Sequence, residues 1–261
     1  EKLLNWFKDK ERVLVSLSGG VDSALVAYAA NEKLGINAIA VTADYKTLSS
    51  EELNSAKTMA REIGIKHKII EYSELDNEDF VKNDEKRCFY CRDELSHKLL
   101  ELASSLEIKT IVDGTQSDDI GDYRPGIDAL HGNGIRSPLL ETKFTKELVR
   151  KTAKSVDLSI FDKPSNSCLA SRIPWGQRVT AEKLARIEIG EKIIKQKTGI
   201  QQVRVRDIDG TARIEVESDQ IHLFNDDIIK NEIFAKLQMI GFSKVKIDPD
   251  GYFSGKLNVL Y

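Results

Sequence analysis

The sequence has few cysteines, few prolines and no long apolar run. Three cysteines, an odd number in 261 residues, exclude a disulfide scaffold, so a reducing, cytoplasmic setting is expected. No stretch approaches the roughly 18–20 apolar residues of a membrane span. The first ten residues predict a short amphipathic helix rather than a signal peptide. No membrane partner is therefore expected.

An excess of charge of one sign is also lacking. The 39 basic and 42 acidic residues give a net charge of −3, and residues 175–261 are close to neutral by themselves. Such a chain has no basic field to attract a long polyanion, so nucleic acid is not an expected partner. A small anionic ligand needs only a few well-placed arginines, so the charge does not exclude a substrate of the size of a nucleotide.

What the sequence does contain is a globular composition, with 41% hydrophobic and 31% charged residues. Short β-branched runs alternate with amphipathic helix patterns as far as residue 113, which predicts an α/β fold with a doubly wound parallel sheet. The predicted strands are residues 12–17, 36–42, 66–72 and 108–113, and the predicted helices are 24–34, 50–63 and 91–106.

From residue 114 the alternation stops, and a segment rich in Gly, Asp and Pro follows the carboxyl end of a strand. Ligands of open α/β sheets bind at that edge. A helix (145–156) and a loop then lead to a small α+β unit, and we place the domain boundary between residues 174 and 175. That unit, 175–261, is predicted to contain helices 181–198 and 225–240 and strands 202–206, 212–216 and 244–248.

The string SGGVDS (residues 18–23) comes directly after the first predicted strand and opens a helix. Its glycines let the backbone approach an anion, and the N–H groups of a helix N-terminus favour negative charge. An aspartate would repel bare phosphate, so we expect it to hold Mg²⁺. No Walker lysine is present, which argues against γ-phosphoryl transfer; the simpler alternative is an ordinary helix N-cap. The residues predicted to bind nucleotide here are Ser18, Gly19, Gly20, Asp22 and Ser23.

The loop resembles the SGGxDS loop of the ATP pyrophosphatase (PP-loop) superfamily. The resemblance implies that ATP is cleaved between its α- and β-phosphates, that a substrate oxygen takes AMP and that pyrophosphate leaves. It also implies that Thr42, at the end of the second strand, lies near the adenine, and that Gly114 and Thr115 line the nucleotide site. For Gly114 an equally simple interpretation is a turn glycine.

Cys88 and Cys91 form a Cys-Phe-Tyr-Cys string, and Cys168 lies far along the chain. The spacing is compatible with small buried side chains, with a redox pair, with a zinc site that takes His97 as a further ligand, or with a thiol that reacts. It is also compatible with a [4Fe–4S] cluster on three thiolates, whose fourth iron is open to sulfide. We favour the cluster. Beside an adenylating loop, such thiolates indicate sulfur transfer.

Three longer strings resemble the LarE family of ATP-dependent sulfur transferases, which act in the biosynthesis of the nickel-pincer nucleotide cofactor. They are GDYRPG (121–126), SCLASRIPWG (167–176) and VRVR (203–206). The resemblance implies that carboxylates of pyridinium-3,5-biscarboxylic acid mononucleotide are adenylated and converted to thiocarboxylates. It also implies a homo-oligomer.

One branch of that family gives up the sulfur of a single sacrificial cysteine, which becomes dehydroalanine, and Cys168 matches it. This chain departs from the branch because Cys88 and Cys91 are also present. A sacrificial thiol acts once, whereas an open cluster iron can be reloaded by a sulfide donor. The prediction is therefore catalytic sulfide delivery from a cluster on Cys88, Cys91 and Cys168, with Asp22 as the magnesium ligand.

Arginines are the candidates for holding the substrate phosphate. Arg204 and Arg206 are two residues apart in a predicted strand, so they share one face and can grip a phosphate together. The alternative is a solvated strand face. Arg172, with Ser171 beside it, is close to Cys168, and Arg124 is expected to order the ligand loop.

Three competing functions remain open at this point. A tRNA thiolase of the same superfamily would need a polyanion surface, which the charge disfavours. An amidotransferase-type synthetase would need an ammonia source, and no glutaminase context is visible. A non-enzymatic nucleotide-binding module would bind ATP without releasing pyrophosphate.

Overall fold

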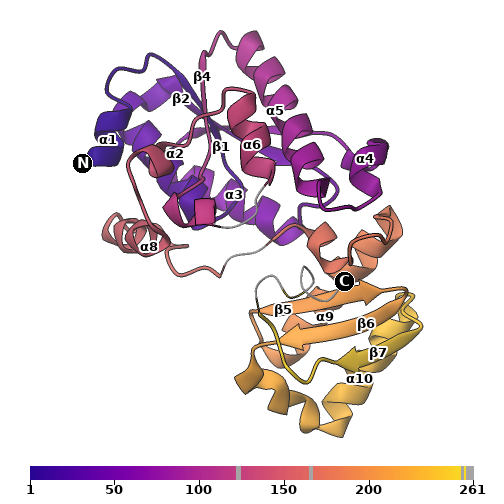
Figure 1. Cartoon of the computed structure of the whole chain (residues 1–261). Helices are drawn as coiled ribbons and strands as arrows, with labels where there is room; N and C mark the ends of the chain where they lie inside the picture. The colour runs from indigo at the N-terminus through magenta and orange to yellow at the C-terminus, as the bar shows by residue number, and fades with distance from the viewer. Residues whose placement is uncertain (122–124, 165–166, 254–255, 257–261) are drawn as a thin grey trace. The chain divides into compact units, whose positions relative to one another are not determined.

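The computed structural model describes residues 1–121, 125–164, 167–253 and 256. It divides into two compact units, the first made of Glu1–Glu74 and Lys86–Asn166 and the second of Leu75–Glu85 and Ser167–Tyr261. Figure 1 shows the path of the chain through both. Among the described residues, none of the helices combines the length and the apolar character that crossing a bilayer requires.

The first unit is built on a four-stranded parallel sheet in the order β3-β2-β1-β4. Its alternation of strands and helices confirms the predicted α/β class. The strands are β1 (Val13–Ser16), β2 (Ala38–Asp44), β3 (Lys66–Glu71) and β4 (Thr110–Val112). The helices of this unit are α1 (Lys2–Trp6), α2 (Val21–Leu34), α3 (Ser50–Ile63), α5 (Arg87–Ser105), α6 (Pro125–Gly132), α7 (Pro138–Glu141) and α8 (Lys146–Ser155).

Helices cover both faces of this sheet because its central strands β1 and β2 are apolar on both sides, whereas the edge strand β3 is partly exposed. Val13 and Val15 point into one core, which contains side chains from α2, α3 and α8. Leu14, between them, points into a second core with side chains from α5 and α6. Successive residues of a strand face opposite sides, so one short run serves two helix layers. The doubly wound arrangement predicted from the sequence follows from this pattern.

The order of the strands creates a topological switch point next to β1. β1 pairs with β2 on one side and with β4 on the other, with Val15 opposite Val112. The chain therefore changes direction across the sheet next to β1, and such switch points are where open α/β sheets bind ligands at the carboxyl ends of their strands. The SGGVDS loop follows β1 and Gly114 follows β4, so both lie at this point.

Two predicted helix starts need correction: α5 begins at Arg87 and not at residue 91, so Cys88 lies inside the helix, and the start of α2 also moves. α2 begins at Val21 and not at residue 24, so Asp22 and Ser23 belong to its first turn. Helix α6 lies inside the segment that the sequence marked as irregular. Proline at the first position of a helix is favourable because its missing N–H is not needed there, and Pro125 of α6 is in that position.

The second unit is a small α+β structure, as expected. Its sheet has the order β5-β6-β7, with an antiparallel pair β5–β6 and a parallel pair β6–β7. Helices α9 and α10 pack on it, and Gly190 of α9 leaves room for Leu237 and Val205. The elements are α4 (Glu78–Val81), α9 (Ala181–Thr198), β5 (Val203–Ile208), β6 (Thr211–Val216), α10 (Asp227–Met239) and β7 (Lys244–Ile247). Across both units the structure also has short 3-10 helices. They are η1 (Gly35–Asn37) and η3 (Ser117–Gly121) in the first unit, η2 (Glu74–Asp76) where the units meet in sequence, and η4 (Leu169–Arg172) and η5 (Ser218–Asn225) in the second.

The division of the chain differs from the boundary placed between residues 174 and 175. The second unit begins at Ser167 and takes in residues 75–85 as well. The buried side chain of Asn83 holds this segment, because its amide donates to the carbonyls of Pro174 (2.7 Å) and Gln177 (2.8 Å). Contacts between residues so far apart leave no local pattern in the sequence.

Candidate functional site

The SGGVDS loop is held in a tight conformation by its own residues. Gly19 has φ +82°, and a Cβ at this position would lie 2.4 Å from the carbonyl oxygen of Glu52, so only glycine fits. The hydroxyl of Ser23 donates to the carbonyl of Gly20 and accepts from the backbone N–H of Ser18, each at 3.1 Å. The loop therefore keeps its shape without a ligand.

The carbonyl of Gly19 is turned inward. It accepts hydrogen bonds from the hydroxyl of Ser55 (3.0 Å) and from Nζ of Lys163 (2.9 Å), and Lys163 also pairs with Glu52 at 3.0 Å. In a trans peptide the N–H points opposite to the carbonyl, so the N–H of Gly20 points away from these partners. This orientation is the one a phosphate-binding loop needs.

The start of α2 completes an anion-binding cradle. Gly20 is the N-cap residue, and no side chain caps the helix. The first N–H groups of a helix lack internal partners, and together with the helix dipole they favour a bound anion. Ser18 is exposed at the edge of this cradle, whereas Ser23 is buried. The start of α2 thus has N–H groups available to an anion, and the binding of phosphate at the SGGVDS loop stays a prediction.

Asp22 sits in the first turn of α2 with one oxygen paired and one not. Its Oδ2 forms an ion pair with Nζ of Lys146, while the buried Oδ1 has no hydrogen-bond partner among the described residues. Burial raises the pKa of Asp22 above its usual range, and Lys146 opposes that rise. Mg²⁺ is usually bound by one or two carboxylates together with phosphate oxygens. An orphaned carboxylate oxygen beside a phosphate cradle fits that requirement.

The end of β4 packs directly against the loop. A Cβ on Gly114 would lie 2.6 Å from the backbone nitrogen of Ser23. Gly114 does not have a positive φ, so close approach and not a turn explains the glycine. Thr115 is fixed next to it, since its N–H donates to Asp113 at 3.2 Å and Asp113 also accepts from Ser137 at 2.6 Å.

The hydroxyl of Thr42 is already used inside the first unit. It donates to the carbonyl of Leu17 at 2.7 Å and lies 2.8 Å from Nε2 of His67. Because the single hydroxyl proton goes to Leu17, the hydrogen of the second contact belongs to His67 Nε2. The contact of Thr42 with adenine stays a prediction.

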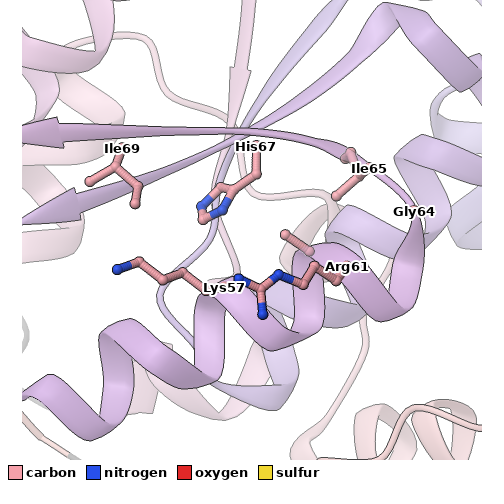
Figure 2. Close-up of a pocket in the computed structure, with 7 residues that line it drawn as sticks. Lys57, Arg61, Gly64, Ile65, His67 and Ile69 are labelled. Atoms are coloured by element: carbon pink, nitrogen blue, oxygen red, sulfur yellow. The ribbon is translucent and has the colours of Figure 1, made fainter.

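His67 also lines a hollow between β3 and α3. The hollow has a volume of about 480 Å³ and is lined by His67 and by the cationic side chains of Lys57 and Arg61. Figure 2 shows these side chains. Burial lowers the pKa of His67 below its usual range, and the charge of Lys57 lowers it further. The remaining lining residues are Ala60, Gly64, Ile65 and Ile69, and none of the predicted site residues is among them.

Cys88 and Cys91 lie at the start of α5, three residues apart and therefore on one face of the helix. The thiol of Cys88 is exposed and that of Cys91 is buried, and neither forms a disulfide. Cys91 Sγ lies 3.8 Å from Glu74 Oε1. A Cβ on Gly126 would lie 3.0 Å from the carbonyl oxygen of Cys88, so Gly126, the last residue of the GDYRPG string, packs closely on this turn. Asp122, Tyr123 and Arg124 of that string lie outside the described residues.

Cys168, in the second unit, is half-buried and precedes η4. The fully buried guanidinium of Arg172 donates to the carbonyl of Cys168 at 3.0 Å and pairs with Glu191 at 2.8 Å. Burial alone would lower the pKa of Arg172, but Glu191 outweighs it and raises the pKa. Arg172 thus organises the backbone around Cys168. Ser171 contributes its carbonyl, which accepts from Arg206 at 2.9 Å.

Arg204 and Arg206 do share one face of β5, as predicted, but that face is not solvated. Their exposed fractions are only 3% and 5%. Arg206 pairs with Glu215 at 2.6 Å, and the guanidinium of Arg204 lies over the ring of Tyr252 at 5.2 Å. Burial and the charge of Arg172 lower the pKa of Arg204 to about 10. Binding of a phosphate by these arginines stays a prediction.

The structure thus brings the phosphate loop, Asp22 and Gly114 together in the first unit, which also holds Cys88 and Cys91. Cys168 and the arginines belong to the second unit. In the part of the chain that is described, no group of three or more His, Cys, Asp and Glu side chains is arranged to hold a metal ion. Two residues at the loop, Lys146 and Lys163, escaped the sequence analysis because isolated lysines carry no motif.

A glycine-rich loop between β1 and α2, at a sheet switch point and without a Walker lysine, defines the class of PP-loop ATP pyrophosphatases. Comparisons agree, since the asparagine synthase family matches residues 7–106. An uncharacterized protein of Synechocystis is 42% identical, covering 99% of this chain and 96% of its own. The pyridinium-3,5-bisthiocarboxylic acid mononucleotide synthase of Lactiplantibacillus plantarum is 32% identical, covering 96% of this chain and 90% of its own.

The chain therefore belongs to the LarE family, to which that synthase belongs, and it is an ATP-dependent sulfur transferase. This confirms the resemblance noted in the sequence. The NH(3)-dependent NAD(+) synthetase of Fusobacterium nucleatum is 37% identical over only 76 residues, 29% of each chain. A match over less than a third of either chain does not carry the reaction of that synthetase over to this chain.

Proposed function

We propose that the chain adenylates a carboxylate of pyridinium-3,5-biscarboxylic acid mononucleotide with ATP and then replaces an oxygen by sulfur. The observation that carries this proposal is the relationship, over nearly the whole length, to a synthase whose product contains thiocarboxylates. The intact phosphate cradle with its orphaned Asp22 oxygen supports the ATP half of the reaction. The three free cysteines support the sulfur half.

The residues of the loop act on the phosphates. The N–H groups at the start of α2 hold phosphate oxygens, and Asp22 would hold Mg²⁺, which when bound would supply positive charge to neutralise the phosphates. A substrate carboxylate oxygen attacks the α-phosphorus, and pyrophosphate leaves. Sulfide sulfur then attacks the activated carbonyl carbon, AMP leaves with the carboxylate oxygen, and a thiocarboxylate remains.

We propose further that Cys88, Cys91 and Cys168 hold a [4Fe–4S] cluster. Free thiol side chains are the right donors, and the i, i+3 spacing at the start of α5 puts two of them on one helix face. When bound, the cluster would supply an open iron that takes up sulfide from a donor.

The arginines of the second unit have separate proposed roles. Arg204 and Arg206 bind the phosphate of the mononucleotide together, since both lie on one face of β5; Arg206 exchanges its pairing with Glu215 for the phosphate. Arg172 acts through the backbone of Cys168, because its donors are engaged by Glu191, Ser167 and Cys168. A homo-oligomer and a separate sulfide donor belong to the same proposal.

Anaerobic reconstitution with iron and sulfide tests the cluster. About four irons and four or more sulfides per chain are expected, and Cys88→Ala and Cys91→Ala should each lose most of them. Ser104→Ala, at the exposed far end of α5, is the matched control and should keep the metal content. Protein that takes up no iron, or cysteine variants that retain all of it, would contradict the cluster and leave Cys168 as a sacrificial sulfur source.

A further inference from the structure

Lys146 is the first residue of α8, and it reaches the phosphate loop. Its ammonium group pairs with Oδ2 of Asp22. Its position is fixed, because its backbone N–H donates to Asp118 at 2.8 Å and Thr145 caps the helix through the N–H of Leu148. The lysine side chain is still 29% exposed, so a ligand bound at the SGGVDS loop can approach it.

The ion pairs around the SGGVDS loop indicate that Lys146 is available to bind an anionic ligand. The other lysine at the loop, Lys163, is held by the carbonyl of Gly19 and by Glu52. Lys146 has only Asp22 as a recorded ion-pair partner among the described residues. With Mg²⁺ on Oδ1 of Asp22, the single negative charge of that carboxylate would be shared between the metal and Lys146, so the ammonium would be only partly neutralised and would favour a further anion. The phosphate groups that the cradle is built to hold supply one.

We propose that Lys146 is a catalytic residue that binds the β-phosphate of ATP and stabilises pyrophosphate as the leaving group. It thereby provides, from a helix distant in sequence, the cation that the SGGVDS motif lacks. The carboxylate oxygen of the substrate forms a bond to the α-phosphorus, and the bond from that phosphorus to the bridging oxygen breaks. The electron pair stays on the bridging oxygen, next to the ammonium of Lys146, which remains protonated throughout.

This assignment rests on the AMP-forming use of ATP and needs neither the cluster nor sulfur transfer. Binding of nucleotides to the full-length chain tests it without turnover. Isothermal titration with ATP, pyrophosphate and AMP, in Mg²⁺ and without the carboxylate substrate, separates the phosphates that are contacted. AMP lacks the β-phosphate and serves as the internal reference.

The variant Lys146→Met should weaken the binding of ATP and of pyrophosphate about tenfold or more, which is typical for a lost charged hydrogen bond. Binding of AMP should change less than about twofold on the same scale. Lys146→Arg should restore most of the affinity for ATP. Lys151→Met, at an exposed position of the same helix, is the matched control and should bind all three as the unchanged chain does.

Two results would overturn the proposal. One is unchanged affinity of Lys146→Met for ATP and pyrophosphate. The other is an equal loss for AMP accompanied by a lower melting temperature, which would mean that Lys146 only supports the fold around Asp22. A chain that binds as expected but transfers no sulfur would refute the proposed function and leave the role of Lys146 in place.

Discussion

Gly114 lies so close to Ser23 that a Cβ on the glycine would come within 2.6 Å of the serine backbone nitrogen. The contact joins the end of β4 to the first turn of α2, across the switch point of the sheet. The segment after β4 therefore forms one wall of the phosphate cradle, and its shape and that of the SGGVDS loop depend on each other.

Gly114→Ala should disturb both sides of this contact. The new methyl group meets backbone and not a movable side chain, so about 1–3 kcal/mol of stability should be lost. ATP affinity should fall about tenfold, since the N–H of Ser23 moves. Gly132→Ala is the control, because no heavy atom lies near its Cβ position. Equal behaviour of the two variants in ATP titration and thermal unfolding would contradict the account.

Asn83 is expected to stabilise the second unit. Asn83→Ala leaves the carbonyls of Pro174 and Gln177 without their buried donor, which should lower the free energy of unfolding by about 2–3 kcal/mol. Asn83 has a positive φ of 60°, so Asn83→Gly separates the lost hydrogen bonds from backbone strain. Asn231→Ala, at an exposed site in α10, should change stability by less than about 0.5 kcal/mol in urea unfolding.

His67 should make stability depend on pH. Its pKa is lowered in the folded state from 6.5, so the unfolded chain binds the proton more readily. Its contribution to stability is therefore complete above about pH 6.5 and declines as the pH falls toward the lower folded pKa. His67→Gln should flatten the free energy of unfolding between about pH 7 and pH 5. Lys57→Met should reduce this pH dependence in part, since it removes one of the two causes of the lowered pKa of His67. If the free energy of unfolding depended on pH equally in both variants and in the unchanged chain, the proposed environment of His67 would be wrong.

Arg172 and Glu191 should depend on each other for stability. Arg172→Met leaves a buried carboxylate without its partner and should cost about 3–5 kcal/mol. Replacing both residues, Arg172→Met with Glu191→Met, should recover much of that loss, because no buried charge remains unpaired. A double-mutant cycle by urea unfolding measures this coupling. Strictly additive losses would mean that the ion pair does not hold the segment around Cys168.

The sequence predicted those features that rest on local patterns. A strand such as Val13–Ser16 and a motif such as SGGVDS can each be recognised from a few consecutive residues. The strands and the loop therefore lie where the sequence predicts them. Helix α6 was missed because its glycine and proline composition is typical of a turn. Lys146 and Asp22 are 124 residues apart, and Lys163 and Gly19 are 144 apart, so only the folded chain shows that they meet.

The sequence also did not predict that the charged side chains of Arg204 and Arg206 are buried. Arg204 and Arg206 alternate with valines, a pattern typical of a strand with one wet face, yet both guanidiniums are buried. Their cover comes from Glu215, Tyr252 and the chain near Ser171, none of which the alternation identifies. The position of Arg172 near Cys168 predicts a substrate-binding residue. The sequence does not show that Arg172 pairs with Glu191, because Glu191 lies on helix α9, 19 residues further along the chain.

The most direct test of the account counts the thiocarboxylates formed per chain under anaerobic conditions, with ATP, Mg²⁺, excess sulfide and the mononucleotide, followed by the intact mass of the protein. Catalytic sulfide delivery predicts many products per chain, with Cys168 unchanged and one AMP formed for each sulfur transferred. A reaction that stops after a single product, with Cys168 converted to dehydroalanine, would contradict it.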